Sequence, residues 1–239
     1  MPKYEEIANV LRERIQSGEY PTDGFMPNQV ALVNEFGVSR MTIKKAINIL
    51  TMEGLVYSQR GSGTKVLNHP FLKDKNLSYL KDYQGLSNDF ENTSHDLVSE
   101  PIDFTVEFPD EVVQERLMIS DSHPVYNILR LRILDGKPFV LEHTYMPVDL
   151  VPGLTKIHIR HSIYSYLKKE LGIKFAGAYR TISADKSSAD DQKYLNCDEH
   201  DPILEIKQVI YQKDGRPIEF SRSRNRFDVR AYSYLDIQV

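Results

Sequence analysis

Three cations within one short segment have the types and spacing needed to bind DNA. In "FGVSRMTIKKAINIL", residues 36–50, Arg40, Lys44 and Lys45 lie on a predicted helix whose apolar residues recur at helical spacing. Arginine has forked donors that match the two acceptors of guanine, whereas lysines one turn further along can meet phosphate. The segment therefore predicts a base contact through Arg40 and phosphate contacts through the two lysines.

A glycine-rich stretch, "SQRGSG" at residues 58–63, follows this segment. Gly61, Ser62 and Gly63 would let the backbone approach the sugar-phosphate chain closely, and Arg60 could enter the minor groove. Each feature by itself has a plainer explanation, since cations often line a solvated helix face and glycines often form a tight turn. Their order and spacing after two short helices favour DNA binding.

A second pair of cations lies in "RLRIL", residues 130–134. Alternation along a strand places Arg130 and Arg132 side by side on one face. Two neighbouring guanidiniums repel each other unless an anion lies between them, and a phosphate or carboxylate ligand would satisfy both. The alternative is structural ion pairing with Glu142 or Glu219, and the residues alone favour that alternative.

The composition limits the class of protein. The chain has 239 residues, a formal net charge of −4 and a pI near 6.0, so any contact with nucleic acid must come from a local basic patch. The single Cys197 excludes an internal disulfide, and the polar start lacks the pattern of a signal peptide. No window approaches the roughly 18 apolar residues of a membrane span. We therefore expect a soluble, cytoplasmic protein.

The elements predicted around the first cations form a winged helix-turn-helix over residues 1–67. Helical periodicity, caps and glycine stops predict helices at about 4–17, 28–36 and 39–53, and short strands at 55–57 and 64–67. In such a domain the second helix of the pair enters the major groove with its N-terminal residues toward the base edges. This places Ser39, Arg40 and Thr42 at the bases.

The remainder of the chain predicts an α+β domain. Residues 68–80 are polar and interrupted by Pro70, which indicates a linker. Beyond it, "RLRILDGKPFVLE" and "KQVIYQKDGRPIEFS" each place an Asp-Gly turn between two strand-like runs, and a helix is predicted between them. We expect residues 81–239 to form a mainly antiparallel sheet with helices.

The N-terminal 67 residues resemble the DNA-binding domain of GntR-type transcription regulators. The resemblance lies in "YEEIANVLRERIQSGEY", "FMPNQVALVNEFGVSRMTIKKAINIL" and "EGLVYSQRGSGTKV". The chain has Met26-Pro27-Asn28-Gln29 where that family usually has Leu-Pro-Ser-Glu. The resemblance implies DNA contacts by Arg40, Thr42, Lys44 and the wing. With the residues inferred above, the predicted DNA-binding set is Ser39, Arg40, Thr42, Lys44, Lys45, Arg60, Gly61, Ser62, Gly63 and Thr64.

The rest of the chain resembles the UTRA effector-binding domain of the HutC subfamily. The resemblance lies in "LRLRILDGKPFVLEHTYMP", "HSIYSYLKKELGI" and "DGRPIEFSRSRNRFD". It implies a chorismate-lyase-like fold in which Ser87, Arg130 and Arg132 hold the anionic end of a sugar phosphate, and Glu142 and Glu219 hold its hydroxyls. Ser162 and Tyr164 belong to the same site by position. The predicted effector-binding set is Ser87, Arg130, Arg132, Glu142, Ser162, Tyr164 and Glu219.

Together these features predict a ligand-responsive transcription regulator. We expect a repressor that leaves a palindromic operator when it binds a small anionic metabolite such as a sugar phosphate, and that acts as a homodimer. The alternatives are a carboxylate effector, an enzyme using the chorismate-lyase-like domain, and a constitutive architectural DNA binder. No catalytic or metal-binding arrangement supports an enzyme, since Cys197 and His200 lie in a polar loop. No cofactor or metal is expected.

Overall fold

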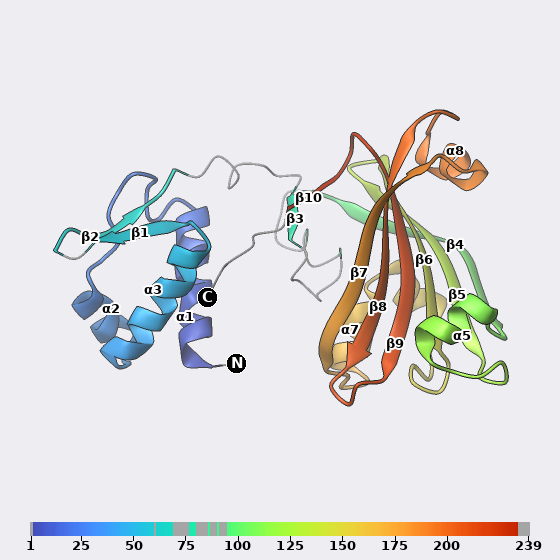
Figure 1. Ribbon diagram of the computed structural model, residues 1–239, viewed down its shortest axis with the longest axis horizontal. Helices are drawn as coiled ribbons and strands as arrows, with labels where there is room; N and C mark the ends of the chain where they lie inside the picture. The colour runs from blue at the N-terminus through green and yellow to red at the C-terminus, as the bar shows by residue number, and fades with distance from the viewer. Residues whose placement is uncertain are drawn as a thin grey trace. The chain divides into compact units, whose positions relative to one another are not determined.

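The computed structural model describes residues 2–59, 61–68, 77–79, 86, 90 and 95–233. The chain divides into two units, one formed by Met1–Lys75 with Tyr234–Val239 and the other by Asn76–Ser233. Each unit consists of its own elements (Figure 1) and has its own apolar core.

The first unit is a winged helix-turn-helix, as predicted. Its elements are α1 (Lys3–Gln16), α2 (Gln29–Phe36), α3 (Arg40–Met52), β1 (Val56–Gln59) and β2 (Gly63–Val66). Asn28 caps α2 by accepting a hydrogen bond from the Ala31 amide, and Ser39 caps α3 by accepting one from the Thr42 amide. Gly37 ends α2 in the left-handed conformation that glycine adopts without strain. The apolar faces of the three helices meet in one core.

The second unit is built on a six-stranded sheet, visible in Figure 1 with strand order β4-β5-β6-β9-β8-β7. Each of its neighbouring pairs is antiparallel. The strands are β4 (Leu97–Glu107), β5 (Val125–Leu134), β6 (Lys137–Pro147), β7 (Phe175–Lys186), β8 (Pro202–Gln212) and β9 (Pro217–Arg226). The prediction of an α+β fold with a mainly antiparallel sheet is confirmed.

Helices cover both faces of this sheet. They are α5 (Glu111–Leu117), α6 (Lys156–Arg160), α7 (Ile163–Lys169) and α8 (Ala189–Leu195). On one face, α6 and α7 pack on Ile128 of β5 and Ile210 of β8. On the other, α5 packs on Val125 and Phe220, and α8 on Leu131. We call the first the α6/α7 face and the second the α5/α8 face.

Both predicted Asp-Gly hairpins are present. Asp135 and Gly136 join β5 to β6 with φ angles of 49° and 76°, and Gly215 turns β8 into β9 with a φ of 89°. The Asp135 carboxylate also accepts a hydrogen bond from the Asp96 amide, 2.9 Å away, which secures the turn against the start of β4. These turns bring β5, β6, β8 and β9 together in the middle of the sheet.

The region predicted as a linker, residues 68–80, contains a short strand. This strand, β3 (Leu77–Tyr79), pairs in parallel with β10 (Ala231–Ser233), which follows β9 near the end of the chain. A three-residue strand is too short to show an alternating pattern, so the sequence indicated a linker there. The pairing therefore joins the segment before the first strand of the six-stranded sheet to the segment after β9.

Candidate functional sites

The start of α3 presents two exposed cations. Arg40 is its first residue and Lys44 lies one turn further along, and both are exposed. Within the described part of the chain, no ion pair occupies either side chain. Ser39 and Thr42 bond to each other instead, with 2.9 Å between their hydroxyl oxygens. Their capping bonds fix the helix end that carries Arg40.

The other cations of this unit are partly engaged. The ammonium of Lys45 lies 5.5 Å from the centre of the Tyr4 ring on α1, and that of Lys65 lies 3.1 Å from the Asp23 carboxylate. Glu53, the acid at the end of α3, is held by Arg12 at 2.6 and 2.8 Å. Lys45 is exposed too and keeps its charge beside the ring, so Arg40, Lys44 and Lys45 share the exposed positive charge of α3.

The wing has an exposed tip and a buried base. Gly61, Ser62 and Gly63 are exposed, and the two glycines have φ angles of 85° and 90°. Thr64 differs, because its side chain is buried and its hydroxyl oxygen lies 3.2 Å from that of Ser58. The Thr64 side chain thus packs within the wing, and a DNA contact by Thr64 stays a prediction. Arg60 lies outside the described residues.

On the α6/α7 face, two arginines converge on one carboxylate. Nε of Arg130 lies 2.7 Å and Nη1 of Arg132 lies 3.4 Å from the same oxygen, Oε2 of Glu142. Arg130 and Glu142 are directly paired across β5 and β6, so they share a face. Arg130 also donates to the Ile159 carbonyl of α6 at 3.3 Å. The ion pair that the residues alone favoured is therefore formed, with Glu142 as its acid.

Burial raises the electrostatic cost of this cluster. Arg132 is 1% exposed, and burial lowers its pKa to about 10, with Glu142 opposing the shift and Arg130 adding to it. Burial alone would raise the pKa of Glu142, but the charges of Arg130 and Arg132 outweigh it and hold that pKa below its ordinary value. The carboxylate is thus firmly ionised between two cations in a site poor in water.

Glu219 forms a second cluster on the same face. Its Oε1 accepts hydrogen bonds from Tyr164 of α7 at 2.9 Å, from Gln208 of β8 at 3.0 Å and from Ser221 of β9 at 2.7 Å. Burial raises the pKa of Glu219, although the three donors oppose the shift. Burial also raises the pKa of Tyr164 well above its ordinary value, so the phenol stays a donor.

The two clusters share one face of the sheet and act on each other electrostatically. The charge of Glu142 acts on both Tyr164 and Glu219, raising the pKa of each. The structure thus brings together Arg130, Arg132, Glu142, Tyr164 and Glu219 of the predicted set. Ser162 caps α7 by accepting from the Ser165 amide at 3.2 Å, which places it next to Tyr164 in the chain. Ser87 lies outside the described residues.

Sequence reasoning missed several members of this face. Gln208 bridges Glu219 to Arg180 of β7, whose Nε donates to its amide oxygen at 2.9 Å. Asn225 of β9 is fully buried, and its Oδ1 has no hydrogen-bond partner among the residues that the structure describes. Gln208 and Ser221 are directly opposite each other in β8 and β9. Their place in the site follows from the register of these two strands, which requires knowing that the strands are neighbours.

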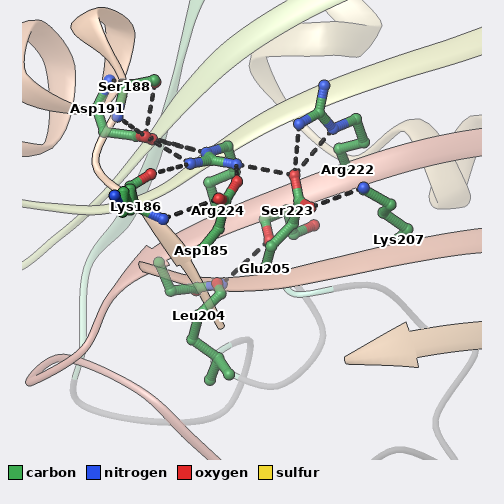
Figure 2. A network of polar contacts seen from close by, with 11 residues as sticks. Asp185, Lys186, Ser188, Asp191, Leu204, Glu205, Lys207, Arg222, Ser223 and Arg224 are labelled. Carbon is green, nitrogen blue, oxygen red and sulfur yellow. Dashed lines mark hydrogen bonds and ion pairs between the residues drawn. The ribbon is translucent and has the colours of Figure 1, made fainter. Parts of the chain in front are cut away.

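The α5/α8 face carries a separate network of charges, drawn in Figure 2. Arg224 donates to Asp191 of α8 at 2.8 Å and, with Arg222, to Glu205 of β8 at 2.9 and 2.6 Å. Asp191 also closes the N-terminal capping box of α8 with Ser188. The network fastens α8 to the sheet. Arg222 and Arg224 thus alternate along β9 as Arg130 and Arg132 do along β5. Their carboxylate partners, however, lie on the α5/α8 face.

Comparison with known proteins identifies both units. A family model described as "Bacterial regulatory proteins, gntR family" matches residues 3–66, and the UTRA domain model matches residues 93–229, more than half of the chain. The chain belongs to the GntR family. The resemblances inferred from the sequence are confirmed, and the family is one of transcription regulators rather than enzymes. Its members combine DNA binding with a small-molecule effector bound by the UTRA domain.

Relatives of this GntR-family chain cover its whole length. The HTH-type transcriptional regulator GmuR of Bacillus subtilis is 42% identical over 238 residues, which is 100% of both chains. The mannosyl-D-glycerate transport/metabolism system repressor MngR of Escherichia coli is 31% identical and covers 98% of this chain and 94% of its own. The crystal structure of the possible regulator YydK from B. subtilis shares the fold, with 24% identity, a TM-score of 0.80 and coverage of 99% and 100%.

Among the described residues, no group of His, Cys, Asp and Glu side chains could hold a metal ion. In the same residues, no helix is long and apolar enough to cross a membrane.

Proposed function

We propose that this GntR-family regulator is a repressor whose homodimer leaves a palindromic operator when the UTRA domain binds a small anionic metabolite such as a sugar phosphate. A regulator that binds chromosomal DNA works in the cytoplasm, where we expect this one. The observation that carries the proposal is the pair of buried arginines on the α6/α7 face, held by Glu142 beside the Glu219 cluster.

The arginines support an anionic ligand. Each guanidinium is a permanent cation with a planar fork of N–H donors, the geometry that binds phosphate or carboxylate, and Glu142 already accepts from both. The lowered pKa of Arg132 means that its surroundings disfavour its charge, and an arriving phosphate or carboxylate would relieve that cost. Glu142 holds the two forks in place before a ligand arrives, so the structural ion pair and the binding role are compatible.

The second cluster supports a ligand with hydroxyl groups. Glu142 and Glu219 are acceptors, and Tyr164, Gln208 and Ser221 are donors beside them. The Oδ1 of Asn225 is a further buried acceptor on this face, with no partner in the described part of the chain, and a ligand hydroxyl would satisfy it. A phosphorylated sugar matches both clusters. A carboxylate metabolite without hydroxyls would match the arginines alone.

The first unit supports operator binding by a dimer. The capped start of α3 presents Arg40 and Lys44 where a recognition helix meets the major groove. Helix-turn-helix proteins bind half-sites about one helical turn, roughly 34 Å, apart, so two copies are needed for a palindrome. The relative MngR is named as the repressor of a mannosyl-D-glycerate transport/metabolism system, which supports a repressor role here.

A ligand screen tests the effector class. Sugar phosphates, the same sugars without phosphate, and hydroxylated and plain organic acids are each added to the full chain, and the melting temperature is measured. A ligand at 100 times its dissociation constant stabilises the folded state by about 2.7 kcal/mol. We expect sugar phosphates to raise the melting temperature and to weaken operator binding. Stabilisation by plain organic acids alone would favour the carboxylate alternative.

Arg132→Ala tests the site, with Arg222→Ala on the α5/α8 face as the control for loss of one arginine. We expect Arg132→Ala to fold and bind the operator but to ignore the ligand, while Arg222→Ala responds normally. If Arg132→Ala instead unfolds, Arg132→Lys keeps a charge beside Glu142 and allows the same comparison. A folded Arg132→Ala variant that still responds fully would refute the assignment.

A further inference from the structure

Arg230 lies at the junction between β9 and β10. The chain leaves β9 at Arg226 and turns, with the Val229 amide donating to the Arg226 carbonyl at 3.2 Å. Val229 then packs against a small apolar cluster that contains Phe139 and Val140 of β6. Arg230 follows directly and is itself followed by Ala231, the first residue of β10.

Aromatic rings hold the Arg230 guanidinium beside the candidate effector site. Its central carbon lies 5.6 Å from the centre of the Phe139 ring and 4.5 Å from that of the Tyr232 ring. Phe139 precedes Val140, which is paired with Arg132 across β5 and β6. The charge of Arg230 also lowers the pKa of both Arg132 and Glu142. Arg230 is therefore a third cation at the Arg132 end of the site.

The same apolar cluster contains residues that precede β4 in the chain. Leu86 is buried in it, and the Phe90 ring meets the Phe139 ring edge-on at 6.0 Å. Phe139 thus contacts one segment before the sheet, at Phe90, and one after it, at Arg230. Both segments lie near the arginine end of the candidate site.

The strand that begins after Arg230 is β10, and it pairs with β3, which follows the DNA-binding unit in the chain. Ala231 is opposite Leu77, and Tyr232 is opposite Ser78, in the parallel pair of β10 with β3. Because the Arg230 guanidinium lies 4.5 Å from the centre of the Tyr232 ring of β10, a ligand that fixes the guanidinium acts on a side chain of this pair. Three residues a side make a weak pairing that small forces can tighten or loosen.

We propose that Arg230 is a further anion-binding residue of the effector site and that it transmits occupancy of the site to the β3–β10 pair. The inference rests on the proposed function. An anion bound at Arg130 and Arg132 attracts the Arg230 fork, and a charge-assisted bond to phosphate is stronger than stacking on a ring. The bound anion then fixes Arg230, and β10 is held more firmly against β3.

Hydrogen exchange of the full chain tests this inference, with inorganic phosphate and glucose 6-phosphate as probes and glucose as the uncharged control. In the wild type, we expect either phosphate probe at saturation to slow amide exchange in residues 77–79 and 231–233. Arg230→Gln should weaken binding of the probe by about tenfold or more, the usual effect of losing one charged hydrogen bond. At saturation it should show no slowing at β3 and β10.

Two further variants separate this role from a structural one. Arg226→Gln removes the same charge four residues earlier, where the arginine pairs with exposed Asp228, and should behave as the wild type. Arg230→Lys keeps a cation between the rings and should recover part of the affinity and of the slowing. Recovery by lysine is not expected if Arg230 served only to pack β10.

The outcomes distinguish the inference from the proposed function. If Arg230→Gln binds the probes as the wild type does, Arg230 is not an anion-binding residue. If it binds weakly but still shows the slowing at β3 and β10, Arg230 does not transmit occupancy. Either result overturns the inference and leaves the proposed function standing. If neither probe binds the wild type, the phosphate class of effector is wrong and the inference fails with it.

Discussion

Arg40 and Lys44 occupy different places on the same helix, so their loss should affect DNA binding differently. Arg40→Ala should cost about 1–3 kcal/mol on the operator and relax specificity at one base position, because its fork matches guanine. Lys44→Ala should weaken all sequences similarly and reduce the salt dependence. Titrations of operator variants at several salt concentrations measure both effects. An Arg40→Ala protein with unchanged operator affinity would contradict the assignment of α3 as the recognition helix.

Lys45 provides a comparison on the same helix. Its ammonium lies over the Tyr4 ring of α1, whereas Lys44 has no such contact among the described residues. We expect Lys45→Ala to lose less operator affinity than Lys44→Ala, since part of its role is within the domain. A larger loss for Lys45→Ala would show that the lysine leaves Tyr4 for phosphate in the complex.

Glu219 should make the stability of the protein depend on pH. Burial raises its pKa in the folded state, so folding favours the protonated form. The stabilisation from this group is complete below the pKa of the unfolded carboxyl and is lost as the pH rises through the folded pKa. Glu219→Gln removes the ionisation while its amide oxygen can still accept from Tyr164, Gln208 and Ser221. The variant should therefore gain stability relative to the wild type as the pH rises from about 4 to 8.

Melting curves of both proteins across that pH range measure the effect. Glu100→Gln, at an exposed position of β4, is the control for loss of a carboxylate. A constant difference in melting temperature between wild type and Glu219→Gln would contradict the raised pKa.

At the scale of elements, the cap of α2 replaces a residue usual in the family. Asn28 accepts from the Ala31 amide at 2.9 Å, which is the bond that a serine at this position would make. Asn28→Ala should destabilise the first unit by about 1 kcal/mol, and Asn28→Ser should be nearly neutral. Chemical denaturation monitored in the first unit measures both. Equal losses in both variants would mean that the cap contributes nothing specific.

The α8 network predicts an unequal effect of two neighbouring arginines. Arg224 is buried against Asp191, which is 0% exposed, so Arg224→Ala leaves a buried carboxylate unpaired and should cost about 3–5 kcal/mol. Arg222 is partly exposed, and its partner Glu205 also forms ion pairs with Arg224 and Lys207. Because those two pairs remain, Arg222→Ala should cost about 1 kcal/mol or less. Denaturation of the two variants tests this difference. Similar losses would show that α8 is held mainly by its apolar contacts.

At the scale of the whole molecule, a homodimer on a palindrome requires fixed phasing of the half-sites. Inserting about 5 base pairs between them places the second half-site on the opposite side of the duplex. Operator affinity should then fall to that of a single half-site, and an insertion of about 10 base pairs should restore part of it. Gel-shift titrations with the three operators measure this. Insensitivity to spacing would contradict binding as a rigid pair and favour independent DNA-binding heads.

The two functions of the molecule must also be coupled in both directions. An effector that lowers operator affinity by a factor typical of such coupling, about 5–150-fold, must itself bind more weakly to the operator complex by the same factor. Ligand titrations with and without operator, compared with operator titrations with and without ligand, measure the two factors. A ligand that binds the free protein and its operator complex equally well would not be the effector.

Features that depend on neighbouring residues could be predicted from the amino-acid sequence. The caps at Asn28 and Ser39 and the turn at Asp135 and Gly136 are formed where the local pattern placed them, because each depends on a few consecutive residues. The alternation of β5 likewise put Arg130 and Arg132 on one face. The family resemblance, carried by longer motifs, supplied the order of the two domains.

Only the tertiary structure decided which groups meet across the sheet. Glu142 pairs with both arginines, whereas Glu219 bonds to Tyr164, although the residues alone allowed either acid to be the partner. Which acid meets the arginines depends on the strand order β5-β6-β9-β8. This order brings together segments that are far apart in the chain, so no pattern of neighbouring residues predicts it. For the same reason, the neighbourhood of Arg230 and the pairing of β10 with β3 could be found only once the chain had folded.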